Sequence, residues 1–234
     1  MNVNPDDAAR EPDARGNRRE LPQVGRIRGE SGAPGGLQAE RSRRTRALLV
    51  ATARELFAER GYAAVTTEEI VRRSGLTRGA LYHHFDGKRD LFREVFEEME
   101  RELTERVATD VLASHDPSAG LVAGLELFLD ACLEPDVQRI ALVDAPAVLG
   151  WDEWHEIEAR HGLGLIEAGL RGAMEVGQIT EQPVAALSHV LLGAMIEAGL
   201  YVARAEDRRS ARAEMSLVLR RLIDGLRPPE PRHG

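Results

Sequence analysis

The sequence predicts an all-α protein in which a small three-helix module precedes a larger helical domain. Aromatic residues make up only 4% of the 234 residues, whereas Ala, Leu, Glu and Arg, which favour helices over strands, are abundant. Apolar residues recur at helical spacing from Arg41 almost to the end of the chain, and no strand-like alternation persists. The apolar content of 43% is sufficient for a hydrophobic core.

Charge is distributed unevenly along the chain. Residues 41–90 contain 11 Lys/Arg and 6 Asp/Glu, a net charge of +5, whereas residues 91–234 contain 14 and 26, a net charge of −12. A basic module on an acidic body indicates that the small module binds a polyanion. Charge scattered over solvated helix faces is the alternative explanation.

Several classes of protein are disfavoured by simple counts. The single cysteine, Cys132, excludes an internal disulfide and a structural zinc site of several thiolates. No apolar run approaches the ~20 residues needed to cross a bilayer, and the N-terminus lacks an apolar signal core. We therefore expect a cytoplasmic protein with no membrane partner, metal or cofactor.

The positions of helix caps and of Pro- and Gly-rich stretches predict four segments. Residues 1–40, rich in Pro, Gly, Asp and Arg, are expected to form a disordered tail. A three-helix module is expected over 41–87, a helical domain over 88–227 and a short tail over 228–234. Within them we expect helices at 41–59, 67–73, 78–84, from an Asp86 N-cap to about Leu112, and at 118–133, 135–143, 152–177, 183–204 and 207–226.

Residues 65–77 contain the signals of two short helices joined by a tight turn. Thr66 and Glu69 have the spacing of a capping box, in which each side chain satisfies the other's backbone amide. Thr77 is expected to cap the following helix. The intervening "SGL" supplies a glycine that is free to adopt positive φ. This arrangement predicts a helix-turn-helix, whose second helix enters a DNA major groove.

The second of these helices lies in "TRGALYHHF", Thr77 to Phe85. Leu81 and Phe85, four residues apart, are expected to face inward, which leaves Arg78, Gly79, Tyr82 and His83 outside. Arg78 is suited to a guanine edge and Gly79 permits close backbone approach. A metal site is disfavoured because adjacent histidines point about 100° apart on a helix.

Phosphate contacts are expected on both sides of this helix. Tyr82 and His83 are suited to phosphate oxygens, which fix the register of a protein on DNA. Thr67 and Lys88 begin neighbouring helices, whose N-termini favour anions. Arg44, in the basic stretch "RSRRTR", is a further candidate for DNA contact.

The stretch "ARELFAERGYAAVTTEEIVRRSGLTRGALYHHFDGKRDLF" resembles the DNA-binding domain of the TetR/AcrR repressor family. Several pieces match in order across Arg46 to Phe92, and Leu76 departs conservatively from the usual valine. The resemblance implies an all-helical homodimer with a C-terminal ligand and dimerisation domain. By motif it implies DNA contact by Thr67, Thr77, Arg78, Gly79, Tyr82, His83 and Lys88.

The last two helices are expected to form a dimer interface. Residues 183–204 are apolar on more than one face, and residues 207–226 have an apolar stripe with arginines opposite. Pairing with their copies across a dyad would create a four-helix bundle. The interface residues expected are Leu187, Leu191, Ala194, Ala198, Leu219 and Leu222. The alternative is that both helices are core of a monomer.

A ligand pocket is expected beside the glycine-rich helix 152–177. Trp154, His161 and Leu165 lie opposite its solvated side, and Phe128 lies on an earlier helix. Together they would line an apolar site with one polar group, which is typical of ligand pockets. Ordinary core packing is the alternative.

These features together predict a ligand-responsive homodimeric repressor that binds double-stranded operator DNA. An activator or a ligand-independent regulator remains open, as does a helical enzyme or binding protein. For an enzyme, possible metal ligands are Asp144, Asp152, His155, Glu158 and His161. However, His155 and His161 are about 240° apart on one helix, and no glycine-rich phosphate loop or nucleophile elbow is present.

Overall fold

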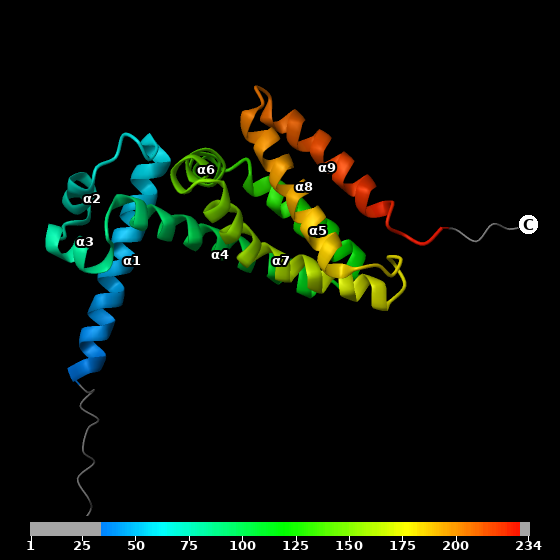
Figure 1. Cartoon of the computed structure of the whole chain (residues 1–234), viewed down its shortest axis with the longest axis horizontal. Coiled ribbons are helices and arrows are strands. Elements are labelled where there is room, and N and C mark those ends of the chain that lie inside the picture. Colours follow the sequence, from blue (N-terminus) through cyan, green and yellow to red (C-terminus); the bar gives the residue numbers. More distant parts are fainter. Residues whose placement is uncertain (1–33, 230–234) are drawn as a thin grey trace, which may run out of the picture.

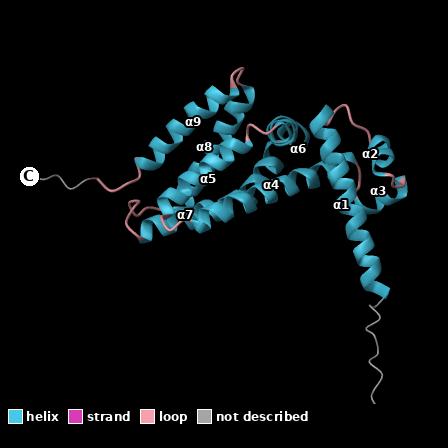
Figure 2. Cartoon of the chain, turned by 180° about the vertical axis from the view of Figure 1, so that it is seen from behind, coloured by secondary structure: helices cyan, strands magenta, loops and turns pink. Residues whose placement is uncertain are grey.

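The computed structural model describes residues 34–229, which are helical throughout apart from turns and short connections (Figure 1, Figure 2). The all-α prediction is confirmed, since the described residues contain no strand. In chain order the elements are α1 (Pro34–Arg60), α2 (Thr67–Ser74), α3 (Arg78–His84), α4 (Lys88–Ala113), α5 (Pro117–Ala131), π-helical η1 (Val137–Asp144), α6 (Ala145–Leu149), α7 (Trp151–Glu175), α8 (Val184–Arg204) and α9 (Arg208–Asp224).

The molecule has a small head and an elongated body that share one helix. Helices α2 and α3 pack on α1, while α4 runs from the head into the body beside α5 and α7. Helices α8 and α9 cover the body on its other side (Figure 1). The N-terminal turns of α1 project beyond α2 and α3.

Two expected helix starts were wrong. Helix α1 begins at Pro34 rather than at 41, so residues 34–40 are helical; residues 1–33 and 230–234 of the expected tails lie outside the described residues. Proline suits the first turn of a helix because its missing N–H is not needed there. Helix α4 is capped by Gly87 and not by Asp86, whose N–H donates to Asp90 Oδ2 at 3.2 Å.

The segment expected as one helix at 135–143 is a π-helical stretch followed by the short helix α6. Pro146 falls in the first turn of α6, and Gly150, at a φ of 84°, ends it. Asp144 lies where the two meet, and its Oδ2 accepts the N–H of Tyr62 at 2.7 Å. This hydrogen bond anchors the irregular connection to the head.

A continuous hydrophobic core extends from the head into the body. Its fully buried side chains include Phe57 of α1, Phe92 and Phe96 of α4, Ile140 of η1 and Trp154 of α7. Helix α4 contributes to this core from Leu91 to Met99, so its first half joins the head to the body.

Helix α8 is the one helix among residues 34–229 that is long and apolar enough to cross a membrane. That is weak evidence for a membrane span, since core helices of globular proteins pass the same test. Here α8 packs against α5, α7 and α9. These contacts bury part of its apolar surface, including Leu191, Leu192 and Ile196.

Candidate nucleic-acid interface and ligand cavity

Helix α2 begins with a cap that is only half of the expected box. Thr66 Oγ1 accepts the N–H of Glu69 at 3.3 Å, as a capping hydroxyl should. The Glu69 carboxylate does not return to Thr66; it pairs with Arg60 at the end of α1. The acidic partner therefore fastens α2 to α1 instead of completing the box.

The turn between α2 and α3 is confirmed in detail. Gly75 has a φ of 69° and its N–H points to Arg72 O, so the glycine closes α2 in the left-handed conformation. Thr77 Oγ1 then accepts the N–H of Ala80 at 3.1 Å and starts α3. These caps fix the position of α3 without using any of its outer side chains.

Helix α3 buries one face and exposes the other, as predicted. Leu81 and Phe85 are 0% and 3% exposed, whereas Arg78, Tyr82 and His83 are exposed. The Arg78 guanidinium lies 5.5 Å from the centroid of the Tyr82 ring and 3.6 Å from Glu68 Oε1. Both contacts are at the surface, so they leave the guanidinium available to a partner.

Gly79 lies on the same outer face, and nothing among residues 34–229 requires a glycine there. A Cβ built on it would meet only Thr77 Oγ1, at 3.9 Å. Its φ is not in the left-handed region. The absence of a side chain therefore creates open backbone on the outer face of α3 and does not serve packing within the protomer.

The residues expected to contact DNA beside α3 differ in the contacts that they already make within the protomer. Thr67 is half-buried at the start of α2, with its hydroxyl 3.2 Å from Glu68 Oε2, and Arg44 pairs with Glu40 at 2.7 Å. The Lys88 ammonium donates to the carbonyls of Tyr62 and Val65, each at 2.9 Å. The same ammonium lies 4.0 Å from the centroid of the Tyr62 ring, so within the protomer Lys88 holds the α1–α2 loop.

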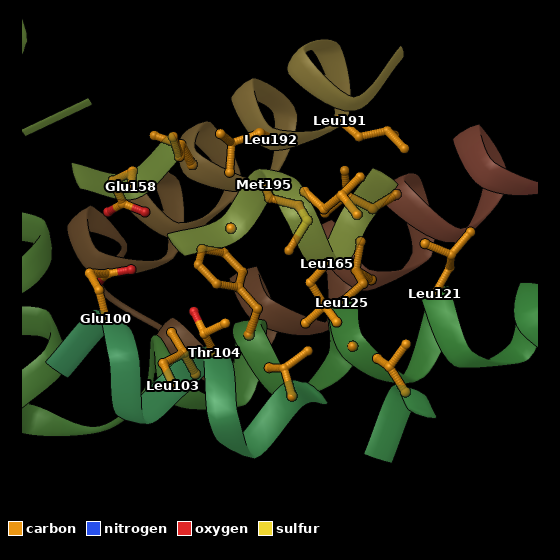
Figure 3. Close-up of a pocket in the computed structure, with 18 of the residues that line it drawn as sticks. Glu100, Leu103, Thr104, Leu121, Leu125, Glu158, Leu165, Leu191, Leu192 and Met195 are labelled. Atoms are coloured by element: carbon orange, nitrogen blue, oxygen red, sulfur yellow. The ribbon is translucent and has the colours of Figure 1, made fainter. Parts of the chain in front are cut away.

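The body contains an apolar cavity of about 90 Å³ between α4, α5, α7, α8 and α9 (Figure 3). Leucine, isoleucine and valine side chains dominate its lining, with Phe128 and Met195. Only Glu100, Thr104 and Glu158 contribute polar side chains, and no lining residue is basic.

Glu100 and Glu158 point toward one another at one end of this cavity (Figure 3). They are only 8% and 6% exposed. Burial raises the pKa of Glu100 to about 7. Burial, followed by repulsion from Glu100, raises the pKa of Glu158 well above its usual range. No hydrogen bond or cation among residues 34–229 offsets either effect.

Only half of the expected pocket residues line the cavity. Phe128 and Leu165 do, but Trp154 and His161 do not. Trp154 is fully buried in the core, where its indole N–H has no partner among the described residues. His161 is half-buried, and burial lowers its pKa. The sequence-based interpretation missed Glu100 and considered Glu158 only as a metal ligand.

Cys132, at the end of α5, lies behind the carboxyl end of the cavity. It is 1% exposed, and burial, with the nearby charge of Glu158 next, raises the pKa of its thiol. Its Sγ lies 3.1 Å from where a Cβ on Gly199 of α8 would be, and the Phe128 ring is 3.2 Å from the same point. Gly199 thus allows α5 and α8 to approach closely here.

The interface residues expected on α8 and α9 mostly face the protomer's own interior. Leu191, Ala198 and Leu219 are buried, and Leu187 and Ala194 are half-buried against the same clusters. Only Leu222, 53% exposed, faces outward. Helix α8 has two apolar faces, and periodicity alone does not say which of them the protomer itself covers. The exposed large apolar side chains on the outer faces of α8 and α9 are Val190, Tyr201, Leu217, Val218 and Leu222.

The acidic and histidine residues do not assemble a metal site within residues 34–229. No group of three or more His, Cys, Asp or Glu side chains is placed to hold an ion. His83 and His84 lie with ring centroids 5.0 Å apart and their planes at 71°. His155 instead stacks on Trp151, with centroids 5.9 Å apart.

Two family models match the two parts of the chain. The family "Bacterial regulatory proteins, tetR family" matches residues 49–95. "Tetracyclin repressor-like, C-terminal domain" matches residues 118–226. These matches cover the head and most of the body, and both families are regulators and not enzymes.

Similar proteins extend over most of the chain. A TetR-family transcriptional regulator from Pectobacterium atrosepticum is 34% identical in sequence and has a TM-score of 0.75, with 81% of this chain and 97% of that one covered. The transposon Tn10 TetC protein of Escherichia coli is 24% identical over 81% of this chain and 96% of its own.

The fold recurs at lower identity in a transcriptional regulator FadR from Bacillus subtilis, solved in complex with stearoyl-CoA. That structure is 18% identical, with a TM-score of 0.63 and coverage of 76% of this chain and 96% of that one. Regulators of this family bind operator DNA, dimerise and bind small-molecule ligands. From the outer face of α3, the two matching domains and the relative at 34% identity, the chain belongs to the TetR family of bacterial transcriptional regulators.

Proposed function

We propose that the protein is a homodimeric repressor, acting in the cytoplasm, that leaves its operator when a small apolar or amphipathic molecule enters the body cavity. One observation carries the proposal: α4 belongs to both sites. Lys88 begins α4 beside the head, and Glu100, Leu103, Thr104 and Val107 of the same helix line the cavity.

DNA is read by the outer face of α3. Arg78 donates two hydrogen bonds to a guanine edge in the major groove. Tyr82, His83 and the hydroxyl of Thr77 bind phosphates beside it, and the bare backbone at Gly79 lets α3 approach closely. Thr67, Arg44 and Lys88 contact the flanking phosphates. The exposure of the α3 residues and the open space at Gly79 support this assignment.

Dimerisation uses the outer faces of α8 and α9 in place of the side chains expected from sequence. Val190 and Tyr201 on α8, with Leu217, Val218 and Leu222 on α9, are 45–67% exposed and apolar or aromatic. Four such helices around a dyad form a bundle with a buried seam. The dimer then presents two α3 helices about one turn of DNA apart, ~34 Å.

Ligand entry acts through α4 on that spacing. The start of α4 is tied to the body by Arg89, which donates to the carbonyls of Val148 and Leu149 and pairs with Glu153 at 2.5 Å. A ligand that separates α4 from α5 and α7, against which it packs in the body, therefore tilts the head relative to the dimer axis. The loss of DNA affinity cannot exceed the ligand's preference for the tilted state. The FadR complex with stearoyl-CoA supports small-molecule binding by this fold.

The test begins with selection of bound sequences from a random DNA pool, followed by fluorescence anisotropy on the selected operator. We expect Arg78→Ala to weaken operator binding about tenfold to a hundredfold and to relax preference at particular base pairs. Arg171→Ala, on the exposed side of α7, removes the same charge far from α3 and should bind as the parent does. Equal binding by the two variants would contradict the assignment of α3. A rise in transcription on operator binding in a reconstituted assay would show an activator.

A further inference from the structure

The two carboxyl groups at the end of the cavity have no partner in the part of the chain that the structure describes. Glu100 comes from α4 and Glu158 from α7, both are more than nine-tenths buried, and both line the cavity (Figure 3). Removing an ionised carboxylate from water is very unfavourable unless a cation or several hydrogen bonds replace the water. Two such groups facing each other add mutual repulsion.

No charged group nearby, among residues 34–229, neutralises the pair. None of the other residues that line this cavity, from α5, α8 and α9, is charged or titratable. Cys132 is the titratable group behind the pair, and its raised pKa keeps the thiol neutral. Arg54 of α1 lines a separate surface hollow with Glu100, but its guanidinium is engaged with Glu102 and Asp136 at 2.6 and 2.9 Å.

We infer that this cavity binds an amphipathic monocation, an amine whose protonated nitrogen lies between Glu100 and Glu158 and whose apolar part lies against Phe128 and the aliphatic lining. The inference rests on the proposed function of the cavity and names the chemical class of its ligand. An anionic ligand would meet carboxylates and no base. A neutral ligand would offer no positive charge to stabilise the ionised form of the pair.

One positive charge, and not two, fits the pair. Burial raises the pKa of Glu100 to about 7, so the pair can give up a proton near neutral pH at little cost. Burial and repulsion from Glu100 also raise the pKa of Glu158, so the pair loses one proton more readily than two. A protonated amine is then bound by one carboxylate and one neutral carboxyl oxygen. Thr104, whose side chain also lines the cavity, is a further acceptor.

The size of the cavity favours a slender ligand. Its volume of about 90 Å³ is below the ~300 Å³ at which ordinary ligand pockets begin. Met195 lines it, and methionine repacks easily around an incoming group. A phenylalkyl or short alkyl chain can therefore enter by displacing Met195 and neighbouring leucines, and this displacement separates the helices around the cavity.

Calorimetry on the full chain with three matched probes tests the inference. Phenylpropylamine, phenylpropanol and phenylpropionate share a ring and a chain and differ in charge. We expect the amine to bind about tenfold tighter than the alcohol, since hydrogen bonds to a charged group are stronger than neutral ones. The amine's affinity should rise about tenfold between pH 6 and pH 8, as Glu100 ionises. Buffers of different ionisation enthalpy should show release of part of a proton at neutral pH.

Three variants complete the design. Glu100→Gln and Glu158→Gln should each weaken amine binding about tenfold and leave alcohol binding unchanged within about twofold. Glu105→Gln, the same substitution on an exposed part of α4, should change neither. The inference is overturned if the alcohol or the acid binds as well as the amine, if no probe binds, or if the two buried-site variants bind the amine as the parent does.

Operator binding, measured separately, distinguishes this inference from the proposed function. Carboxyl-dependent binding of the amine without any change in operator affinity would support the cation site and contradict release by ligand. Release of operator by the neutral alcohol, unaffected by Glu100→Gln, would support ligand control and overturn the cation site.

Discussion

Replacing Glu100 by glutamine should remove a large pH dependence from the stability of the protein. In the folded chain burial raises the pKa of Glu100 to about 7, against a usual value of 4.5. The folded state therefore holds a proton that the unfolded state releases between these two values. Stability from this group is fully present below pH 4.5 and is lost as pH rises to 7 and above.

The size of the effect follows from the shift in pKa. A difference of about two and a half pKa units, at 1.36 kcal/mol per unit, is about 3 kcal/mol of unfolding free energy lost between pH 4.5 and pH 7. Glu158 adds to the loss in the same direction, because its pKa is also raised and the two groups titrate together. The amide introduced by Glu100→Gln has no proton to lose and also relieves Glu158 of a neighbouring charge.

Urea denaturation of parent and Glu100→Gln at pH 5 and pH 8, at one fixed protein concentration, measures the difference. We expect the unfolding free energy of the variant, relative to that of the parent, to rise by about 3 kcal/mol from pH 5 to pH 8. Glu105→Gln is the control, because its carboxylate is exposed, and it should follow the parent. Parent and Glu100→Gln curves that shift in parallel would refute the reasoning, since Glu100 would then titrate alike in the folded and unfolded chains.

Three further changes test the head, its link to the body and the outer face of the dimer. Gly79→Ala should stabilise the fold by up to ~1 kcal/mol of helix propensity and so raise the melting temperature. The added methyl group should hold α3 away from the groove and weaken operator binding at least about tenfold. Unchanged operator binding would contradict the close approach of α3 to DNA. Asp144→Asn weakens the acceptor of the Tyr62 N–H, which links the head to the body. It should leave ligand affinity unaltered and reduce the ligand's effect on operator affinity about fivefold. Titration of ligand with and without operator measures this effect, and an unchanged effect would contradict the role of this link. Val190→Arg, at a side chain 67% exposed in the protomer, should yield a folded monomer by light scattering at micromolar concentration, as should Leu222→Arg; a dimer in both variants would move the interface elsewhere.

Local sequence signals were sufficient for the head. The caps Thr66 and Thr77 and the left-handed Gly75 act on neighbouring backbone, so their effect can be read from spacing alone. The inward orientation of Leu81 and Phe85 could also be predicted from spacing, because residues four apart lie on the same side of a helix. The DNA contacts themselves remain predictions, because they depend on a partner.

The body could not be predicted to the same depth because its sites are assembled from five helices. Trp154 lies one turn before Glu158 on the same stripe of α7, but it is packed in the core shared with the head, and His161 does not line the cavity. A signal for the missed carboxyls does exist. Glu158 follows Trp154 by four residues, and Glu100 follows Phe96 by four. Each acid therefore falls on an apolar stripe, where its carboxyl group is expected to be desolvated and is a candidate functional group.

The rate at which the single thiol of the chain is modified can report how often the helices beside the cavity separate. Cys132 is buried between α5 and α8, and its raised pKa leaves almost no thiolate to react while the helices are closed. A thiol reagent can therefore modify it only after α5 and α8 separate, so the modification rate counts opening events. A ligand that fills the closed cavity will slow this rate, and one that keeps the helices apart will speed it. The direction of change reports which of the two states the bound molecule prefers.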